Sequence, residues 1–243
     1  MDRAGTRGEG FLFVDFTDYG QVVDALHEGS FDAVVHLAAI PAPEIFPESV
    51  TFQNNISATF NVFQAARRAG IQTIVYASSE TLLGIPFDVD PPYAPLDEDY
   101  DSRPESMYAV VKHLEEELAQ KLVRWDPSLS ITALRFSNVM TPDDYPAFAD
   151  FTPESRRWNL WGYIDARDGA QAVLLSLQRA KPGFDRFIIA AADTVLDVPS
   201  ASLLASSYPA VELRFPVGEF QTLLSIDKAR RELGYDPKHS WRD

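Results

Sequence analysis

The sequence predicts an α/β fold with a doubly wound parallel sheet and helices on both faces. Two observations support this. Short, continuously apolar segments are typical of strands covered on both faces. Between them lie longer segments whose apolar residues recur at helical spacing. Each strand–helix–strand repeat of about 30 residues is one right-handed crossover unit.

The predicted elements alternate along most of the chain. Strands are expected at 10–16, 32–39, 72–78, 130–136 and 186–191, and helices at 18–27, 49–69, 105–123, 167–179 and 225–233. Gly29, Gly70 and Gly234 stand just beyond three of these helices, as C-terminal stops do. Residues 141–160, rich in Pro, Asp and aromatic residues, are expected to form a loop or lid.

The two longest predicted helices each carry an apolar stripe that we expect to be buried. The stripes are Phe52, Ile56, Phe60 and Phe63 in the first, and Val111, Leu114, Leu118 and Leu122 in the second.

Composition excludes several classes of function. The net charge of −15 argues against binding nucleic acid or an anionic membrane through the general field, although a local basic pocket for phosphate is compatible with it. The chain has no cysteine, so disulfides and thiolate metal sites are excluded and a reducing cytoplasm is the expected compartment. The four histidines show no ligand spacing, which predicts no metal site. No apolar run reaches the roughly 18 residues of a membrane helix.

Tyr108 and Lys112 stand four residues apart in YAVVK on the helix predicted at 105–123. That spacing puts both side chains on one helix face, one turn apart. A free phenol is a weak base at neutral pH, and a nearby ammonium favours its ionised form. The pair would then remove a proton from a hydroxyl group as hydride leaves the carbon. Because roughly 0.2 such pairs arise by chance in a chain like this, the alternative of a half-buried Tyr beside a surface Lys has to be weighed against context.

Six further segments provide that context. They are DAVVHLAAI (32–40), NISATFN (55–61), YASSETLLG (76–84), LRFSNV (134–139), WGYIDARDGAQA (161–172) and SIDKARRELGYDP (225–237). In this order they resemble motifs of the extended short-chain dehydrogenase/reductases, the NAD-dependent epimerase/dehydratase family. Ala58, where the family usually has Gly, is a mild departure. Each segment is ordinary alone: Leu37 suits a core, Asn138 a turn, and a Ser pair after a strand suits a helix cap.

The resemblance implies a set of site residues. Ser79, Tyr108 and Lys112 would be catalytic, with Ser79 orienting the substrate oxygen and Lys112 bonding the nicotinamide ribose. The implied cofactor contacts are Asp2, Asp15, Phe16, Leu37, Ala38, Ala39, Asn55, Ala77, Ser78, Tyr108, Lys112, Phe136 and Ser137. The implied substrate contacts are Ser79, Glu80 and Asn138.

The family's opening strand and G-x-x-G-x-x-G loop, which cradles the pyrophosphate, are absent from this sequence. The resemblance places Asp2 at the adenosine ribose and Asp15 with Phe16 at the adenine. We therefore expect a Rossmann-like sheet whose strands one and two are absent. Either the natural protein is longer and active, which the intact catalytic motifs favour, or the short chain is a cofactor-deficient relative.

The expected domains are an incomplete NAD(P)-binding domain, 1–140 with parts of 161–191, and a small substrate lobe, 141–160 with 192–243. A homodimer through the helices around 55–66 and 108–122 is implied by the resemblance.

The expected function is an NAD(P)-dependent oxidoreductase or epimerase acting on a sugar, sugar acid or nucleotide-sugar. Asp2 favours NAD over NADP, because a carboxylate repels a 2′-phosphate. Arg156, Arg157 and Arg167 are the basic candidates for a diphosphate, with surface charge as the simpler reading. Two alternatives stay open: a non-catalytic sensor or scaffold, and a sugar dehydratase. Dehydratases carry an Asp–Glu pair after the catalytic Ser/Thr, whereas here Glu80 alone follows Ser79.

Overall fold

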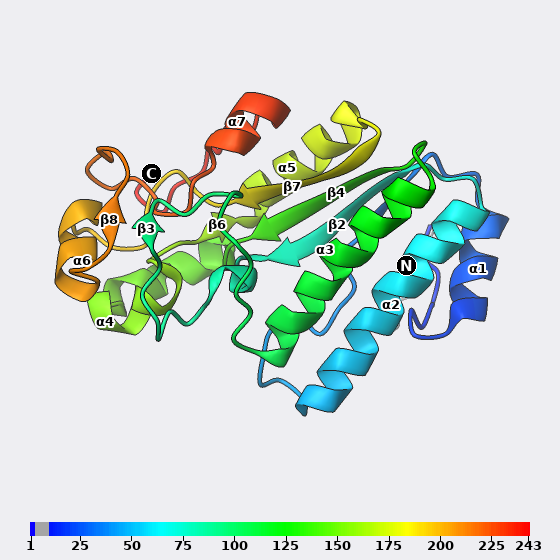
Figure 1. Ribbon diagram of the computed structural model, residues 1–243, viewed down its shortest axis with the longest axis horizontal. Coiled ribbons are helices and arrows are strands. Elements are labelled where there is room, and N and C mark those ends of the chain that lie inside the picture. The colour runs from blue at the N-terminus through cyan, green and yellow to red at the C-terminus, as the bar shows by residue number, and fades with distance from the viewer. Residues whose placement is uncertain (3–9) are drawn as a thin grey trace. The chain divides into compact units, whose positions relative to one another are not determined.

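The computed structural model describes residues 1–2 and 10–243 (Figure 1). The helices are α1 (Tyr19–Glu28), α2 (Glu48–Arg68), α3 (Met107–Trp125), α4 (Pro153–Arg156), α5 (Ala166–Arg179), α6 (Ser200–Ser207) and α7 (Asp227–Leu233), with 3₁₀ helices η1 (Glu80–Leu83), η2 (Pro142–Asp150) and η3 (Arg157–Asn159). The strands are β1 (Ala33–His36), β2 (Thr73–Ser79), β3 (Tyr93–Ala94), β4 (Ser130–Phe136), β5 (Val139–Met140), β6 (Ile164–Asp165), β7 (Gly183–Ile189) and β8 (Glu212–Leu213).

The main sheet has four strands in the order β1-β2-β4-β7. β1 and β2 are parallel, with Ala33 opposite Thr73 and His36 opposite Tyr76. A helix lies between each of these strands and the next along the chain, which is the winding that the sequence predicts. Two further sheets have two strands each, β3 with β8 and β5 with β6.

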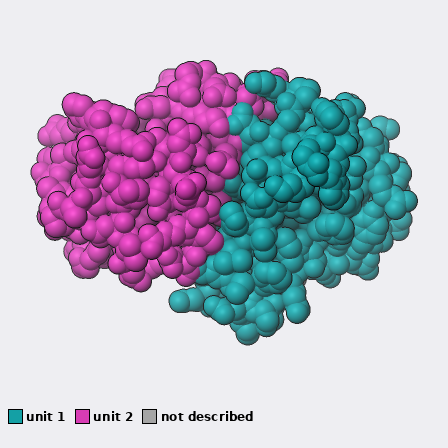
Figure 2. All heavy atoms as spheres, viewed as in Figure 1, with its two compact units in different colours: residues 1–78, 106–133, 180–185 teal, residues 79–105, 134–179, 186–243 magenta. Residues whose placement is uncertain are grey.

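The described chain forms two compact units (Figure 2). Unit 1 comprises residues 1–78, 106–133 and 180–185, and unit 2 comprises residues 79–105, 134–179 and 186–243. Unit 2 includes the segment 79–105, which the sequence assigns to the NAD(P)-binding domain. The functional division into cofactor domain and substrate lobe stays a prediction.

Two helices of unit 1, α1 and α3, begin at side-chain caps. Asp18 accepts a hydrogen bond from the Gln21 amide at the start of α1, and Ser106 accepts one from the Ala109 amide at the start of α3. α2 packs against both α1 and α3, as Figure 1 shows. The core beneath them consists of Val14, Val22, Ala25, Leu26, Val62, Phe63, Ala65, Ala66, Ile71, Ile74, Tyr76, Ala119, Leu122, Leu129, Ile131 and Ala133.

The predicted apolar stripes of α2 and α3 are only partly correct. Phe60 is 45% exposed and Leu114 is 38% exposed. Small and polar residues are buried instead, among them Ala58 and Thr59 in α2 and Glu115 in α3. Small side chains let two helices approach closely, and buried polar ones can pair between them, so the inward face differs from the most apolar face.

Two predicted strands of unit 1 need correction. Residues 10–16 form no strand: Phe13 makes an isolated parallel bridge to Asp2, and Val14 alone of this segment is buried. β1 is shorter than the predicted 32–39 and is not covered on both faces, since Val35 is 41% exposed. β1 lies at the end of the strand order, so an apolar sequence there does not mean complete burial.

Unit 2 contains structure that the sequence patterns did not predict. Residues 141–160 hold η2, α4 and η3, and not a loop alone. Thr141 and Thr152 form capping boxes with Asp144 and Ser155, and a proline follows each threonine. α6 and the two-residue strands were also missed. Among the described residues, no helix is long and apolar enough to cross a membrane.

Candidate functional site

The Tyr–Lys pair lies on the first turns of α3 in unit 1. Tyr108 is 7% exposed and Lys112 is 3% exposed, so the alternative of a half-buried Tyr beside a surface Lys does not describe this pair. Lys112 Nζ donates to the Ala77 carbonyl at 2.7 Å and lies 5.9 Å from the centre of the Tyr108 ring. The structure therefore brings Tyr108 and Lys112 together, as their spacing predicts. Ala77, a predicted cofactor contact, lies beside Lys112.

Lys112 also belongs to a buried set that we call the Lys112 network: Lys112, Glu115, Thr59 and His36. Lys112 Nζ donates to Glu115 Oε2 at 3.0 Å, and Thr59 Oγ1 donates to Glu115 Oε1 at 2.8 Å. His36 Nε2 lies 3.1 Å from the same Thr59 oxygen. The network thus joins three elements, with α2 and α3 donating to the carboxylate and β1 contacting Thr59. Sequence reasoning missed Glu115, Thr59 and His36, because a polar residue at an unpredicted inward position carries no signal of its own.

Electrostatics in the Lys112 network follow from its burial. Burial alone would lower the pKa of Lys112, but the charges of Glu115 and Tyr108 raise it above the usual value. Burial raises the pKa of Glu115, against the lowering effects of Lys112 and Thr59. Burial and then the Lys112 charge lower the pKa of His36 to about 3, so its ring is neutral at physiological pH.

Two other predicted cofactor contacts of unit 1 have structural partners. Ser78 Oγ donates to Glu116 Oε1 at 2.7 Å. Asn55 is fully buried; it accepts from the Ile40 amide at 2.8 Å and donates to the Ile40 carbonyl at 3.0 Å. Asn55 therefore fastens the segment that follows β1.

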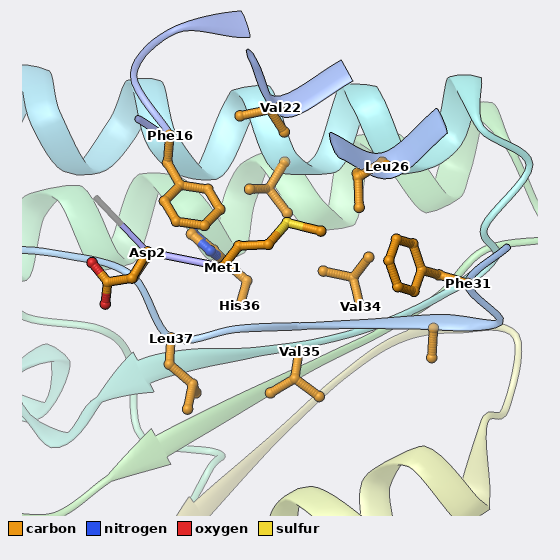
Figure 3. Close-up of a pocket in the computed structure, with 13 residues that line it drawn as sticks. Met1, Asp2, Phe16, Val22, Leu26, Phe31, Val34, Val35, His36 and Leu37 are labelled. Carbon is orange, nitrogen blue, oxygen red and sulfur yellow. The ribbon is translucent and has the colours of Figure 1, made fainter. Parts of the chain in front are cut away.

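Four predicted cofactor contacts line one cavity of about 410 Å³ in unit 1 (Figure 3). These are Asp2, Phe16, Leu37 and Ala38. Most of the remaining wall is apolar and comes from α1, β1 and their surroundings: Met1, Val22, Leu26, Phe31, Ala33, Val34, Val35, His36 and Val62. Asp15 and Ala39 are not in this wall. The Asp15 carboxylate accepts hydrogen bonds from Thr17.

Ser79 begins unit 2 and caps η1. Its Oγ accepts from the Thr81 amide at 3.2 Å and from the Thr81 hydroxyl at 3.0 Å. The cap interpretation of the Ser pair thus describes what this side chain does locally. It leaves the hydroxyl hydrogen of Ser79 available, because both contacts use the oxygen as acceptor.

A second buried set, which we call the Glu80 cluster, comprises Glu80, Ser137, Arg156 and Asn159 of unit 2. Asn159 Nδ2 donates to Glu80 Oε1 at a long 3.3 Å. Four atoms of the cluster have no hydrogen bond of normal geometry within the described part of the chain: Glu80 Oε2, Ser137 Oγ, Arg156 Nε and Asn159 Oδ1. Burial raises the pKa of Glu80 to about 7, against smaller lowering effects from Ser137, Asn159 and Arg156.

The remaining predicted site residues, Phe136 and Asn138, flank Ser137 of the Glu80 cluster in the sequence. Arg156 Nη1 donates to Asn138 Oδ1 at 3.1 Å, so this substrate candidate is already engaged. Gly162 is closely approached here: a Cβ would lie 2.8 Å from Leu224 Cδ1 and 3.0 Å from Ser137 Oγ, so one of these side chains would have to move. Phe136 is half-buried.

The three basic candidates differ in their surroundings. Arg156 is 6% exposed, and its guanidinium carbon lies 4.9 Å from the ring centres of both Phe151 and Trp158. Arg167 pairs with Asp165 at 2.8 Å, and Arg157 lies 3.6 Å from Glu154. Across residues 1–2 and 10–243, no three His, Asp or Glu side chains are placed to hold a metal ion.

Comparison with known proteins gives the family. The model of the NAD dependent epimerase/dehydratase family matches residues 2–190, and the chain belongs to that family. The resemblance found in the sequence motifs is therefore confirmed.

Named relatives agree with this assignment. UDP-glucose 4-epimerase 2 of Oryza sativa subsp. japonica is 27% identical over 135 residues, 55% of this chain and 32% of that protein. UDP-glucose 4-epimerase of Corynebacterium glutamicum is 25% identical over 260 residues, 90% of this chain and 75% of that protein. The chain thus spans about a third of the first relative's length.

A solved structure confirms the predicted fold class. The UDP-glucose 4-epimerase from Bifidobacterium longum in complex with NAD⁺ and UDP aligns with a TM-score of 0.69 at 20% identity. The alignment covers 94% of this chain and 78% of that one. At this identity the match establishes the α/β fold with its central parallel sheet.

Proposed function

We propose that the protein is an NAD-dependent oxidoreductase or epimerase that moves hydride on a hydroxyl-bearing small molecule, with Tyr108 as acid and base. The observation that carries the proposal is the buried Tyr108–Lys112 pair. The Lys112 ammonium is fixed by the Ala77 carbonyl beside the Tyr108 ring. A phenol held beside a fixed ammonium is the arrangement that proton transfer to and from an alcohol uses.

The residues of unit 1 fit a nicotinamide dinucleotide at two places. The cavity near Asp2 offers a carboxylate for ribose hydroxyls and an apolar wall for an adenine ring. Lys112 has three N–H groups, of which two donate to Ala77 and Glu115, so one remains for a ribose hydroxyl. When bound, the cofactor would supply the hydride acceptor and donor. Tyr108 would hold or release the proton, and the family resemblance gives Ser79 the role of orienting the substrate oxygen.

The family and the named relatives support a substrate class. Several relatives are epimerases of UDP-glucose, and the solved relative from Bifidobacterium longum contains UDP. A nucleotide-sugar, free sugar or sugar acid is therefore the class to test. Arg156 is the basic side chain least accounted for by surface pairing, although its buried place among Phe151, Trp158 and Asn138 suits structural support equally well.

The test has a binding arm and a turnover arm. Thermal melts with NAD⁺ and NADH should show a saturable upshift, about 2.7 kcal/mol of stabilisation at one hundred times the dissociation constant. In a screen of UDP-sugars, sugars and sugar acids, Tyr108→Phe should lower turnover by about 10²–10⁴-fold. Tyr100→Phe removes a hydroxyl from another buried tyrosine and should leave turnover unchanged. Full activity in Tyr108→Phe would refute the role of Tyr108.

A second candidate function is sugar dehydration. It is favoured by one observation: Glu80 follows Ser79 directly and has a pKa of about 7, so this carboxyl can carry a proton at neutral pH. A dehydratase would convert a nucleotide-sugar to a keto-sugar with loss of water. Product analysis by mass spectrometry separates the two functions, because an epimerase product keeps the substrate mass.

The proposed partner is a second copy of the chain, through α2 and α3. Phe60 and Leu114, one on each helix, are large apolar side chains left exposed. Phe60→Asp should convert a dimer to a monomer in sedimentation velocity, whereas Leu174→Asp, at an exposed position on α5, should not. A monomeric wild-type chain would refute this proposal.

A further inference from the structure

The Lys112 network buries a second ionisable group, the Glu115 carboxyl, beside the Tyr108–Lys112 pair. Glu115 is fully buried, and placing a carboxylate in the interior is unfavourable unless both of its oxygens have partners. Here both do. Lys112 donates to Oε2 at 3.0 Å and Thr59 donates to Oε1 at 2.8 Å. The carboxylate is therefore held in one orientation by donors from two helices.

His36 completes the network by fixing the direction of the Thr59 hydroxyl. The ring is neutral at physiological pH, so it carries one N–H. Because the Thr59 hydrogen is used on Glu115, the Thr59 oxygen accepts from His36 Nε2 at 3.1 Å. Each hydrogen in the series from His36 to Thr59 to Glu115 then points toward the carboxylate. This arrangement stabilises the charged form of Glu115.

We infer that Glu115 is a positioning residue, which keeps Lys112 charged and fixed beside Tyr108, and that Thr59 and His36 hold Glu115 in place. The inference rests on the proposed function and adds to it the residues that set the state of the Lys112 ammonium. A fixed ammonium directs its remaining N–H in one direction, whereas a neutral or mobile amine does not.

Several groups act on Lys112 and have to be separated in a test. α3 contributes Tyr108, Glu115 and Glu116, and β1 contributes His36. β2 contributes the Ala77 carbonyl, and α2 contributes the Thr59 hydroxyl through Glu115. Glu116 accepts from Ser78, so it is a second carboxylate near Lys112 that Glu115 variants leave in place.

The decisive variant is Glu115→Gln, which keeps the shape and removes the charge. Burial then acts on Lys112 with less compensation, so the pH midpoint of its amine should fall by about one unit or more. The ε-carbon resonance of Lys112 in a ¹³C NMR titration measures that midpoint in the protein without cofactor or substrate. Glu117→Gln removes a 3.1 Å ion pair with Lys121 on the exposed side of the same helix, and should leave Lys112 unchanged.

A midpoint that stays in place in folded Glu115→Gln would overturn the inference. If Glu115→Gln does not fold, Thr59→Val decides the matter, because it removes one donor to Glu115 and leaves every charge. Thr59→Val should lower the Lys112 midpoint by less than Glu115→Gln would, and an unchanged midpoint would again overturn the inference.

The pH profile of turnover supplies a readout that a merely structural role would not move. Because Lys112 in Glu115→Gln loses its proton at a lower pH, the basic limb of the rate profile should move to lower pH, and Glu115→Asp should restore part of it. Failure of the proposed function gives a different result: wild-type protein without NAD-dependent turnover on any substrate. The NMR titration is read independently of that result.

Discussion

The Lys112 network and the Glu80 cluster are both buried sets of polar side chains, yet their hydrogen bonding differs. In the first, both oxygens of the Glu115 carboxylate have donors. In the second, four buried polar atoms lack a bond of normal geometry within the described residues. Paired charges in a protein interior are fixed, whereas a poorly paired carboxyl is driven toward its neutral form. Burial raises the pKa of both carboxyls, but Lys112 and Thr59 oppose this effect with a donor on each Glu115 oxygen, whereas the pKa of Glu80 rises to about 7.

The largest expected effect comes from removing the cation of the Lys112 network. Lys112→Met leaves Glu115 buried without its counter-ion, which should reduce the free energy of unfolding by about 3–5 kcal/mol. Urea denaturation measures this. Lys121→Met breaks the exposed pair with Glu117 and should change stability by about 0–1 kcal/mol. Equal effects of the two variants would contradict the distinction between fixed and exposed pairs.

The next effect concerns pH and the Glu80 cluster. A folded-state pKa near 7, above the ordinary 4.5, means that the native state binds the extra proton between these values. Its stabilising contribution is therefore complete below about pH 4.5 and is lost as pH rises through 7. Glu80→Gln should remove this loss, so that the variant gains up to about 3 kcal/mol relative to wild type between pH 5 and 8.

Thermal melts at the two pH values test this expectation. Asp144→Asn is the control of opposite sign. The Thr141 hydrogen bonds lower the pKa of Asp144, so its contribution is present at neutral pH and is lost in acid. Parallel pH curves for wild type and Glu80→Gln would show that Glu80 does not titrate near neutrality.

The smallest expected effect is the difference in stability lost on removing two buried hydroxyls, those of Thr59 and Ser137. Thr59→Val leaves Glu115 Oε1 and His36 Nε2 without their partner and should reduce stability by about 1–3 kcal/mol. Ser137→Ala removes a hydroxyl that has no bond of normal geometry, and should reduce stability by about 0–1 kcal/mol. Chemical denaturation of both variants measures the difference. A larger loss in Ser137→Ala would mean that the Glu80 cluster is as well paired as the Lys112 network.

The sequence correctly predicted the fold class and the proximity of Tyr108 and Lys112. Apolar runs and helical spacings located β2, β4 and the long helices, because the burial of a strand or a helix face produces a periodic pattern among residues close in sequence. The four-residue spacing of Tyr108 and Lys112 fixed their shared face.

What the sequence did not show depends on contacts between distant segments. In the sequence, Glu115 is one of several acidic residues on its helix. Its hydrogen bond with Thr59 depends on how α2 packs against α3, which local sequence does not determine. The exposure of Phe60 has the same origin, since the closest approach of those helices uses smaller side chains. The stretch 10–16 has the apolar composition of a strand, but its pairing among the described residues is limited to the isolated bridge between Phe13 and Asp2, and a strand needs a continuous ladder of such pairs.

β1 stands at the end of the strand order and is held by β2 on one side, with half-exposed Val35 on its face and a cavity beside it. Local opening requires least free energy where few apolar contacts cover the backbone. In hydrogen–deuterium exchange, the amides of residues 33–36 should take up deuterium ahead of those of β2 and β4. This strand, which carries His36, is thus where unit 1 begins to unfold, while the interior strands report the stability of the whole unit.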